Sequence, residues 1–357
     1  MVVPNIVRRR RFVVVHQPSF SRMEHEEVKV RRGPRSGLPV VVAIHSRALG
    51  PAAGGIRLRR YPDWRDGLAD ALRLSEAMTD KNAAAGLDFG GGKTVIALGP
   101  GTELTPSLRE AALLDVGELI ESFGGTYFGG PDVGTGPDDM VVVRRSTSRV
   151  FCLPPEHGGT GSSSIPTALG VFAALRAGAR HVFGSAELTG RTVVISGLGS
   201  VGALVAQHVA AAGARVVVSD VDPAKRASGY EWVDPEKALR TPADIVVPAA
   251  VGGVLSAELV PELSAPLIVG PANNQLTSET VADDLAARGI VWVPDFIASA
   301  GGAVYTLLRE VEGLPHEEAT ARVEAIGTTV SEVLASARDK ETTPLREARA
   351  RVAARLA

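Results

Sequence analysis

A glycine-rich turn between a short apolar strand and a helix constrains the fold of this chain more than any other feature. The apolar run at residues 191–196 is followed at once by Gly197-Leu198-Gly199-Ser200-Val201-Gly202, which opens a predicted helix at residues 203–212. The next apolar run, at residues 215–219, ends at Asp220. Glycines at this spacing let the backbone approach a pyrophosphate, whose charge the start of the helix stabilises. The pattern predicts a doubly wound, Rossmann-type dinucleotide-binding domain.

Asp220 indicates which dinucleotide this domain binds. A carboxylate at this position accepts hydrogen bonds from the adenosine ribose hydroxyls and repels a 2′-phosphate. Lys225 and Arg226 lie close enough in the sequence to soften that preference. We therefore expect NAD as the cofactor in preference to NADP. The turn predicts these cofactor-binding residues: Gly197, Gly199, Ser200, Val201, Gly202 and Asp220.

Three more short apolar runs, at residues 244–247, 267–269 and 290–293, extend the predicted parallel sheet. Ligands bind at the carboxyl ends of the strands in open parallel sheets. Asn273 and Asn274 follow the second of these runs, so we expect them to face the cofactor crevice. A plain turn is the alternative interpretation of the paired asparagines.

Length and composition fit a globular protein of two domains. The 357 residues suffice for two cores of ordinary size, and 45% of them are hydrophobic and 22% charged. A net charge of -2 gives no electrostatic reason to expect nucleic acid or an anionic membrane as a partner. The basic residues 8–11 are interpreted as a solvated tail. We expect no metal site.

The same composition bears on the cellular compartment. No apolar run reaches membrane-spanning length, and the N-terminus lacks the apolar core of a signal peptide. Cys152 is the single cysteine, which rules out an intrachain disulfide framework and is typical of a reducing compartment. We therefore expect a cytoplasmic protein.

A stretch crowded with glycine, serine and proline at residues 154–164 predicts a hinge between the two domains. Before it we expect strands at residues 12–15 and 38–44, helices from Asp66 and at residues 110–123, and glycine-rich loops at residues 49–57 and 129–135. After the dinucleotide domain, residues 317–356 are expected to be mostly helical, with an interruption near Thr342-Thr343-Pro344. The predicted domains are residues 1–155, for substrate binding and oligomerisation, and residues 156–334, for the dinucleotide. The last helix, at about 335–357, is expected to return to the first domain.

Two lysines in the first domain stand in unusual surroundings. Lys93 follows Gly90-Gly91-Gly92 directly, and three glycines can take positive φ and remove side-chain bulk, so a turn before a strand at residues 94–98 is expected. Such a turn is often followed by a plain surface lysine. Lys81 continues the inward stripe of a helix, formed by Leu68, Leu72, Ser75 and Met78. It is therefore either a snorkelling side chain or a buried amine with a purpose.

Taken together, the motifs of residues 40 to 340 resemble those of the leucine, phenylalanine and valine dehydrogenases, the short branch of the glutamate dehydrogenase superfamily. The motifs are Leu49-Gly50-Pro51 with Gly54-Gly55, Met78-Thr79 with Lys81-Asn82, Gly90-Gly91-Gly92-Lys93, Pro131-Asp132-Val133-Gly134-Thr135, Pro166-Thr167-Ala168 with Gly170-Val171, the dinucleotide turn, Ala272-Asn273-Asn274, and Pro294-Asp295 with Ala300-Gly301-Gly302. Their order over two domains is more specific than any one of them. The resemblance implies an α/β fold with a cleft between a substrate domain and the NAD-binding domain, and a homo-oligomer.

The resemblance also implies a reaction, the NAD-dependent oxidative deamination of an L-amino acid to its 2-oxo acid and ammonia, or the reverse. Lys81, assisted by Asn274, would bind the substrate carboxylate. Lys93 would be the general base that activates water, and Asp132 would assist proton transfer and hold the substrate amino group. The plain alternative for Asp132 is a helix N-cap or a turn residue. Lysine acts as a base near neutral pH only if burial and a second cation lower its pKa, and Lys81 is expected to supply that cation.

The remaining residues that the resemblance assigns line the substrate and cofactor sites. For the substrate they are Gly54, Gly55, Met78, Gly130, Ala303 and Thr306, and for the cofactor Thr167, Ala249 and Asn273. The sequence departs from the family pattern at Ala249, Pro271 and Ser299, which bear on cofactor affinity and loop geometry.

The substrate side chain is expected to be apolar. Glutamate-specific relatives carry a lysine just before the paired glycines, where this chain has Ala53, so a substrate carboxylate would be left unpaired. Ala53, Gly130 and Ala303 are small and leave room for a large side chain, which favours phenylalanine. Thr306 offers a hydroxyl that would admit a polar group such as a phenol. The alternatives are leucine or valine, an unusual amino acid of specialised metabolism, or a paralogue that binds the dinucleotide without catalysing the reaction.

Overall fold

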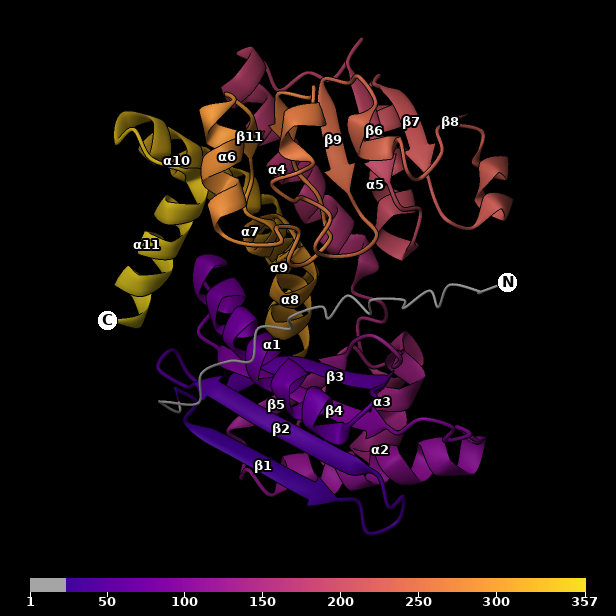
Figure 1. The fold of residues 1–357 in the computed structure, drawn as a ribbon. Coiled ribbons are helices and arrows are strands. Elements are labelled where there is room, and N and C mark those ends of the chain that lie inside the picture. The colour runs from indigo at the N-terminus through magenta and orange to yellow at the C-terminus, as the bar shows by residue number, and fades with distance from the viewer. Residues whose placement is uncertain (1–23) are drawn as a thin grey trace, which may run out of the picture.

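In a computed structural model of the chain, residues 24–357 are described, and they form two domains, each built on one sheet (Figure 1). The predicted strand at residues 12–15 and the basic residues 8–11 lie outside the described part. The first sheet has the strand order β1-β2-β4-β3-β5. Its strands are β1 (Glu27–Arg32), β2 (Pro39–Ser46), β3 (Ala52–Arg60), β4 (Gly90–Leu98) and β5 (Tyr127–Pro131). β1 and β2 run antiparallel to their neighbours, whereas β3, β4 and β5 are parallel.

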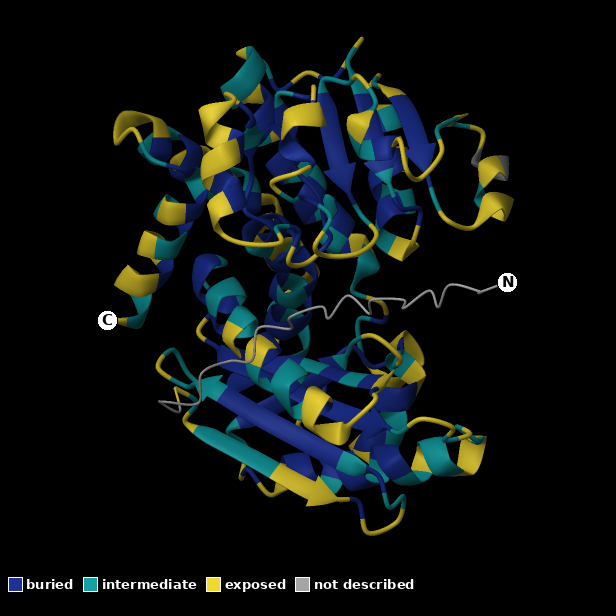
Figure 2. Ribbon diagram, in the orientation of Figure 1, coloured by how far each residue is buried: buried dark blue, intermediate teal, exposed yellow. Residues whose placement is uncertain are grey.

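Helices cover both faces of the first sheet because its strands alternate their side chains between two cores. Val41 and Ala43 of β2 pack with Ala71 of α1 (Trp64–Ala84). Val40 and Val42 of the same strand face the opposite way, toward α2 (Pro106–Glu121) and α3 (Pro137–Arg144). Successive strand residues point to opposite faces of a sheet, which accounts for this division. The central strands are buried along most of their length (Figure 2).

The glycine-rich segments expected to be loops or turns are strands, and those expectations are wrong. Gly90, Gly91 and Gly92 open β4 without positive φ. An added Cβ would lie 1.9 Å from Ser46 O at Gly90, 2.1 Å from Thr79 Oγ1 at Gly91, and 2.5 Å from the Tyr127 ring at Gly92. The predicted loop at residues 49–57 likewise contains most of β3, and that at residues 129–135 contains the end of β5. Close packing of neighbours, not a turn, requires these glycines.

The second domain contains the parallel sheet that the sequence predicts. Its strand order is β11-β10-β9-β6-β7-β8, and every pair is parallel. The strands are β6 (Thr192–Ser196), β7 (Arg215–Ser219), β8 (Glu231–Trp232), β9 (Ile245–Pro248), β10 (Leu267–Ile268) and β11 (Val291–Trp292). The helices α4 (Ser164–Phe183), α5 (Ser200–Ala211) and α6 (Thr280–Ala287) and the short turns η2 (Pro223–Ser228), η3 (Ala238–Arg240) and η4 (Val260–Glu262) complete it. The two-domain α/β fold with a Rossmann-type second domain is confirmed.

The C-terminal helices begin between the two domains, continue along the second domain and return to the first one (Figure 1). They are α7 (Asp295–Ala298), α8 (Gly301–Thr306), the π-helical η5 (Leu307–Val311), α9 (His316–Glu324), α10 (Ile326–Asp339) and α11 (Pro344–Leu356). From α11, Arg349 forms an ion pair with Asp80 of α1, and Arg355 donates a hydrogen bond of 3.0 Å to Leu87 O. None of the helices within residues 24–357 is long and apolar enough to span a membrane.

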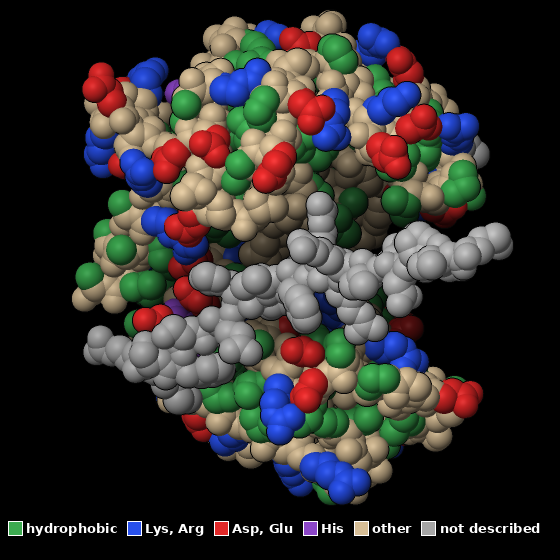
Figure 3. Space-filling view, in the orientation of Figure 1, with side chains coloured by type: hydrophobic (Ala, Val, Ile, Leu, Met, Phe, Trp, Pro, Cys, Tyr) green, Lys and Arg blue, Asp and Glu red, His purple; other side chains and the backbone are tan. Residues whose placement is uncertain are grey.

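The segment at residues 154–164, with the turn η1 (Pro155–His157), connects the two domains and is held by one carboxylate. Glu310 of η5 accepts hydrogen bonds from the backbone N–H groups of Cys152 (3.0 Å) and Thr160 (2.9 Å). Cys152 has a φ of 61°, which is rare for a residue with a side chain. The surface of the molecule is hollowed between the two domains (Figure 3).

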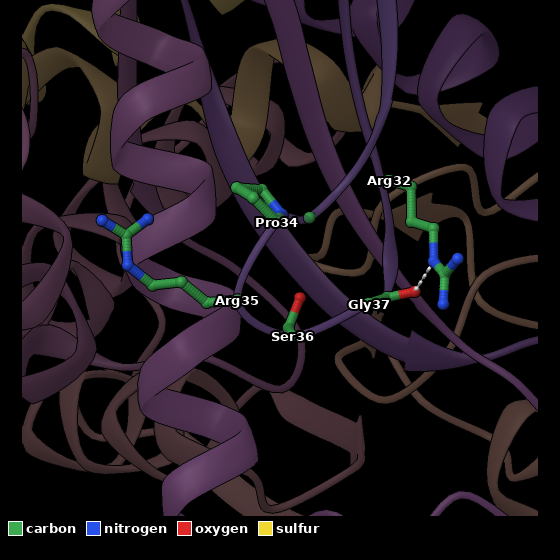
Figure 4. Close-up of a pocket in the computed structure, with 6 residues that line it drawn as sticks. Arg32, Pro34, Arg35, Ser36 and Gly37 are labelled. Atoms are coloured by element: carbon green, nitrogen blue, oxygen red, sulfur yellow. Dashed lines mark hydrogen bonds between the residues drawn. The ribbon is translucent and has the colours of Figure 1, made fainter.

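A small pocket at the turn between β1 and β2 lies at the end of the first domain that is far from the second (Figures 1 and 4). Residues 32–37 line it, and Arg32 Nε donates a hydrogen bond of 3.2 Å to Gly37 O. The buried carboxylate of Asp115 accepts hydrogen bonds from Ser36 N (2.9 Å) and Ser36 Oγ (2.7 Å). These bonds fix the conformation of the turn, and the pocket includes none of the predicted site residues.

Candidate active site

Lys93 and Asp132 come from strands that are not neighbours in the first sheet. Lys93 lies on β4, Asp132 directly follows β5, and β3 runs between these strands. Nevertheless, Lys93 Nζ lies 2.8 Å from Asp132 Oδ2. The ion pair crosses β3 at Gly55, where an added Cβ would lie 2.7 Å from Asp132 Cβ and 2.9 Å from Lys93 Nζ. The absence of a side chain at Gly55 therefore allows the two charged groups to meet.

Gly55→Ala is expected to lower kcat/KM by about 10²-fold, because the new methyl group displaces Lys93 or Asp132 by a distance that matters for positioned groups. The unfolding temperature should change much less, since the clash involves side chains and not backbone. Steady-state kinetics and thermal melting measure both effects. Gly99→Ala is the matched control, because its Cβ would lie 3.6 Å from the nearest atom, Thr102 Oγ1. Equal loss of activity in both variants would contradict the role assigned to Gly55.

Lys93 is buried, with 5% of its surface exposed. Burial lowers the pKa of its amine most, the Asp132 carboxylate opposes this, and the Arg57 guanidinium lowers the pKa further, so the net shift is downward. The sequence prediction named Lys81 as the cation that lowers the pKa of Lys93. In the structure, the cation that lowers this pKa is Arg57 of β3. Its Nε lies 2.8 Å from Asp132 Oδ2, the oxygen that Lys93 also contacts.

Asp132 is ionised and held in a fixed direction. Burial favours its neutral form, but Lys93 and Arg57 outweigh that effect and keep the pKa of the carboxyl well below its usual range. Its backbone N–H donates a hydrogen bond of 3.0 Å to Thr135 Oγ1, which in turn donates to Ile56 O at 2.7 Å. Asp132 is not a helix cap, since α3 begins after Gly136.

Lys81 projects from the last turn of α1 toward the second domain. Its Nζ donates a hydrogen bond of 2.8 Å to Oδ1 of Asn273. Burial lowers the pKa of Lys81 to about 8; the Asp295 carboxylate opposes the shift and the Lys93 amine adds to it. The first domain thus contacts the end of the nucleotide-binding sheet through a lysine.

The prediction paired Lys81 with Asn274, but the structure pairs it with Asn273. The difference arises in the turn after β10, where Asn274 has a φ of 53° in the left-handed region. This turn directs the neighbouring Asn273 side chain to Lys81 and to Ser299, whose Oγ lies 3.4 Å from Asn273 Oδ1. Asn273, predicted to bind the cofactor, therefore contacts the amine expected to bind the substrate.

The dinucleotide turn has the geometry that a pyrophosphate requires. Gly197 has a φ of 115°, and a Cβ on Gly202 would lie 2.0 Å from Gly197 O. A Cβ on Gly199 would meet no atom within 4 Å, so the turn is open on that side. α5 begins at Ser200, and the first N–H groups of a helix, here those of Ser200, Val201 and Gly202, have no partner within the helix. These residues fit NAD, which they would hold by its phosphates.

Asp220 lies at the end of β7, beside this turn. Its Oδ2 accepts hydrogen bonds from Leu198 N (2.7 Å) and Lys225 Nζ (3.0 Å). Burial favours its neutral form, but hydrogen bonds from the backbone and from Lys225 lower its pKa overall. Its Oδ1 accepts a hydrogen bond of 2.9 Å from Asp222 N. The ion pair with Lys225 reduces the repulsion of a 2′-phosphate, as the sequence suggested.

Comparison with known proteins identifies the family. Residues 16–149 match the model described as Glu/Leu/Phe/Val dehydrogenase, dimerisation domain, and residues 218–356 match that of Glutamate/Leucine/Phenylalanine/Valine dehydrogenase. Residues 171–251 match the NAD binding domain of the D-isomer specific 2-hydroxyacid dehydrogenases. Phenylalanine dehydrogenase of Caldalkalibacillus thermarum is 38% identical over 89% of this chain and 87% of its own length.

Two further amino acid dehydrogenases are similar to this chain over most of its length. Valine dehydrogenase of Streptomyces virginiae is 40% identical over 88% of this chain and 89% of its own length. The crystal structure of L-tryptophan dehydrogenase from Nostoc punctiforme matches with a TM-score of 0.77 and 32% identity, covering 93% of this chain and 96% of that one. The chain belongs to the Glu/Leu/Phe/Val dehydrogenase family. It is an oxidoreductase that acts on the CH–NH2 group of a small-molecule donor, with NAD as its cofactor.

The residues predicted to line the substrate pocket of this dehydrogenase differ in their surroundings. A Cβ on Gly130 would lie 2.3 Å from the Phe151 ring, so an aromatic wall already fills the space that the glycine was expected to leave open. A Cβ on Gly54 would lie 1.7 Å from Gly92 O, so Gly54 allows two strands to approach. Thr306 is 1% exposed and its hydroxyl donates to Gly302 O at 2.8 Å, which removes the free donor predicted for a polar substrate. Met78 and Ala303 are half-buried.

Of the two further residues predicted to bind the cofactor, Ala249 lies beside the dinucleotide turn and Thr167 lies in the first turn of α4. The hydroxyl of Thr167 donates a hydrogen bond of 2.7 Å to Ser163 O at the start of α4. Ala249 follows β9, and its Cβ would lie 3.1 Å from a Cβ on Gly202. A larger residue at position 249 would press on the turn.

Arg57 is the residue of this dehydrogenase that the sequence analysis missed. It lies two residues after Gly55 on β3, so both face the same side of the sheet as Lys93 and Asp132. The signal was the period of two residues along a strand. The glycines of this segment favour a loop, to which that period does not apply.

Proposed function

We propose that this dehydrogenase catalyses the reversible oxidative deamination of an L-amino acid with an apolar side chain, with phenylalanine favoured. In balanced form, the amino acid, NAD⁺ and water give the 2-oxo acid, ammonium, NADH and a proton. The observation that supports this most is the buried pair of Lys93 and Asp132, with Lys81 nearby. A lowered amine pKa beside a fixed carboxylate is what proton transfer near neutral pH requires.

The role of each residue follows from its surroundings. Lys81 binds the substrate carboxylate as an ammonium ion, and Asp132 holds the substrate nitrogen. NAD, when bound, accepts the hydride from the substrate α-carbon. Lys93, as a neutral amine, takes a proton from the water that attacks the resulting iminium carbon. The ionised carboxylate of Asp132, 2.8 Å from the Lys93 amine, relays that proton from Lys93 to the departing ammonia. The two domains hold the reacting groups together and exclude water by closing about residues 154–164.

The nature of the substrate side chain is inferred from the walls of the site. Ala53 is fully buried and offers no cation for a second carboxylate, so an acidic side chain would stay unpaired. Phe151 lies directly behind Gly130 and presents an aromatic surface. The relatives named above act on phenylalanine, valine and L-tryptophan, by their names, and all three are apolar.

The function is tested with a panel of apolar, aromatic and acidic L-amino acids, with NAD and with NADP, read by the absorbance of the reduced cofactor. We expect turnover with NAD and phenylalanine or another apolar amino acid, and little with glutamate. Tight NADH binding without turnover of any member of the panel would refute the proposal and indicate a catalytically silent paralogue.

The charge of Lys81 should set the pH dependence of carboxylate binding. Because the pKa of free Lys81 is about 8, its ammonium form disappears above that pH, and a carboxylate then binds an uncharged amine. With NADH present, the Kd of 3-phenylpropanoate, which lacks an amino group, should rise about tenfold per pH unit above pH 8. The Kd is measured by quenching of NADH fluorescence.

Lys81→Met is the matched control for this titration. The variant should bind 3-phenylpropanoate weakly at every pH, with no break near pH 8. A wild-type Kd that stays constant up to pH 10 would exclude Lys81 as the partner of the carboxylate.

We further propose that the protein works in the cytoplasm as a homo-oligomer. A single cysteine is typical of a reducing compartment, and the family model matching the first domain is described as a dimerisation domain. We also propose that the domains are residues 1–155 and residues 156–334, and that the last helix, at about 335–357, returns to the first domain. Size-exclusion chromatography with light scattering measures the oligomer.

A further inference from the structure

Arg57 connects the Lys93–Asp132 pair to a second carboxylate. Its Nε lies 2.8 Å from Asp132 Oδ2, and its Nη1 lies 2.9 Å from Oδ2 of Asp70 on α1. The Arg57 side chain is 13% exposed. Both of its hydrogen-bonding edges are therefore used inside the protein, by two carboxylates from different elements.

Asp70 is itself held, so the guanidinium has a rigid support. The hydroxyl of Tyr61 donates a hydrogen bond of 2.7 Å to Asp70 Oδ2, and Arg73 Nη2 donates one of 2.8 Å to Oδ1. A planar guanidinium between two fixed carboxylates has little freedom to rotate. Arg57 consequently fixes the position of Asp132 relative to α1 and β3.

Arg57 and Lys93 use the same oxygen of Asp132. Both nitrogens lie 2.8 Å from Oδ2, and no hydrogen bond among residues 24–357 uses Oδ1. A carboxylate whose one oxygen binds two cations must direct its other oxygen away from both. Oδ1 is then the acceptor that remains for a substrate nitrogen.

We propose that Arg57 is a positioning residue of the deamination reaction. It fixes Asp132 through Oδ2, so that Oδ1 receives the substrate nitrogen. Lys93 then shares the Asp132 carboxylate with the permanently charged guanidinium of Arg57. The inference rests on the function proposed above. A bridge between β3 and α1 that only stabilises the fold is the competing explanation for the same contacts.

The two explanations differ in what they predict for Lys93. Charged groups from several elements face it: Asp132 after β5, Arg57 on β3, and Asp70 and Lys81 on α1. Without Arg57, one repelling cation is lost and Asp132 interacts with Lys93 alone. Both changes favour the ammonium form and raise the pKa of Lys93. A purely structural bridge would change stability and leave this titration unchanged.

The test compares Arg57→Met and Arg57→Lys with the wild type. For Arg57→Met we expect kcat to fall about 10²-fold and the acidic limb of the pH profile of kcat/KM to move upward by about one pH unit. Arg57→Lys retains a cation and should restore part of the rate and most of the profile. Arg73→Gln removes a different, 54% exposed arginine, which contacts only Oδ1 of Asp70. It should change neither, because Tyr61 and Arg57 hold Oδ2, the oxygen that supports the guanidinium.

A second measurement is independent of turnover. Competitive labelling of amines with acetic anhydride, followed by peptide mass spectrometry, gives the titration of Lys93 without substrate. Its midpoint should rise in Arg57→Met and not in Arg73→Gln. An unchanged midpoint and profile, with the loss confined to the melting temperature, would overturn the positioning role. Failure of the proposed function is recognised separately, because none of the amino acids in the panel would then support the reduction of NAD by the wild type.

Discussion

Lys93→Met is expected to lower kcat by about 10³-fold or more while leaving the chain folded and able to bind NADH. A positioned general base contributes on the order of 10²–10⁴ to a rate. Among residues 24–357, the only other cation paired with Asp132 Oδ2 is the permanently charged guanidinium of Arg57. The variant lacks the base, because methionine has a similar length but no titratable group.

The fold should tolerate this change for a reason visible at the site. Removing one partner of a buried ion pair is usually costly because the other charge stays unpaired. Here Asp132 keeps its contact with Arg57, and the buried amine itself is replaced by an apolar side chain. We therefore expect the free energy of unfolding to change by on the order of 1 kcal/mol, which corresponds to a change of only a few degrees in the melting temperature.

Three measurements separate the effects: the absorbance of NADH for turnover, the fluorescence of NADH for cofactor binding, and circular dichroism for melting. Lys29→Met is the matched control, because Lys29 forms an ion pair with Glu27 on the edge strand β1. It should keep wild-type kcat. Activity of Lys93→Met within tenfold of the wild type would mean that another group is the base.

The parts of this molecule that are determined locally were predictable from the sequence. The dinucleotide turn is one continuous strand, turn and helix, and Gly197 and Gly202 occupy the positions that the pattern requires. The parallel sheet and the interruption before α11 follow from similar local signals. In each case the signal for an element lies within one short stretch of the chain.

The parts that depend on packing between distant segments were not predictable. Glycine runs in β3 and β4 favour a loop on local grounds, whereas here they allow backbone and charged groups from elsewhere to approach. A loop over these residues would not assign Arg57 to a face of the sheet, so the sequence does not predict its contact with Asp132. Lys81 contacts Asn273 and not Asn274 because Asn274 adopts a left-handed backbone conformation, which the sequence of a single chain does not reveal.

Gly91→Ala is expected to destabilise the first domain strongly. The added Cβ would lie 2.1 Å from Thr79 Oγ1, 2.2 Å from Thr79 N and 2.5 Å from Ser75 O, and two of these atoms belong to the backbone of α1. Thr79 cannot rotate away freely, because its hydroxyl is hydrogen-bonded to His45 Nδ1 at 2.9 Å. The helix must therefore move from the sheet, at a cost of about 3 kcal/mol or more.

The same displacement should reach the chemistry, since Lys81 lies two residues beyond Thr79 on α1, and Gly91 and Lys93 face the same side of β4. Folded Gly91→Ala should thus bind the substrate carboxylate more weakly, seen as a higher KM, in addition to melting roughly 10 °C lower. Gly99→Ala, just beyond the end of β4, should match the wild type in both. If Gly91→Ala melts like the wild type, the helix is not held against β4 at this glycine. In that case the spacing between Lys81 and Lys93 must be set elsewhere in α1.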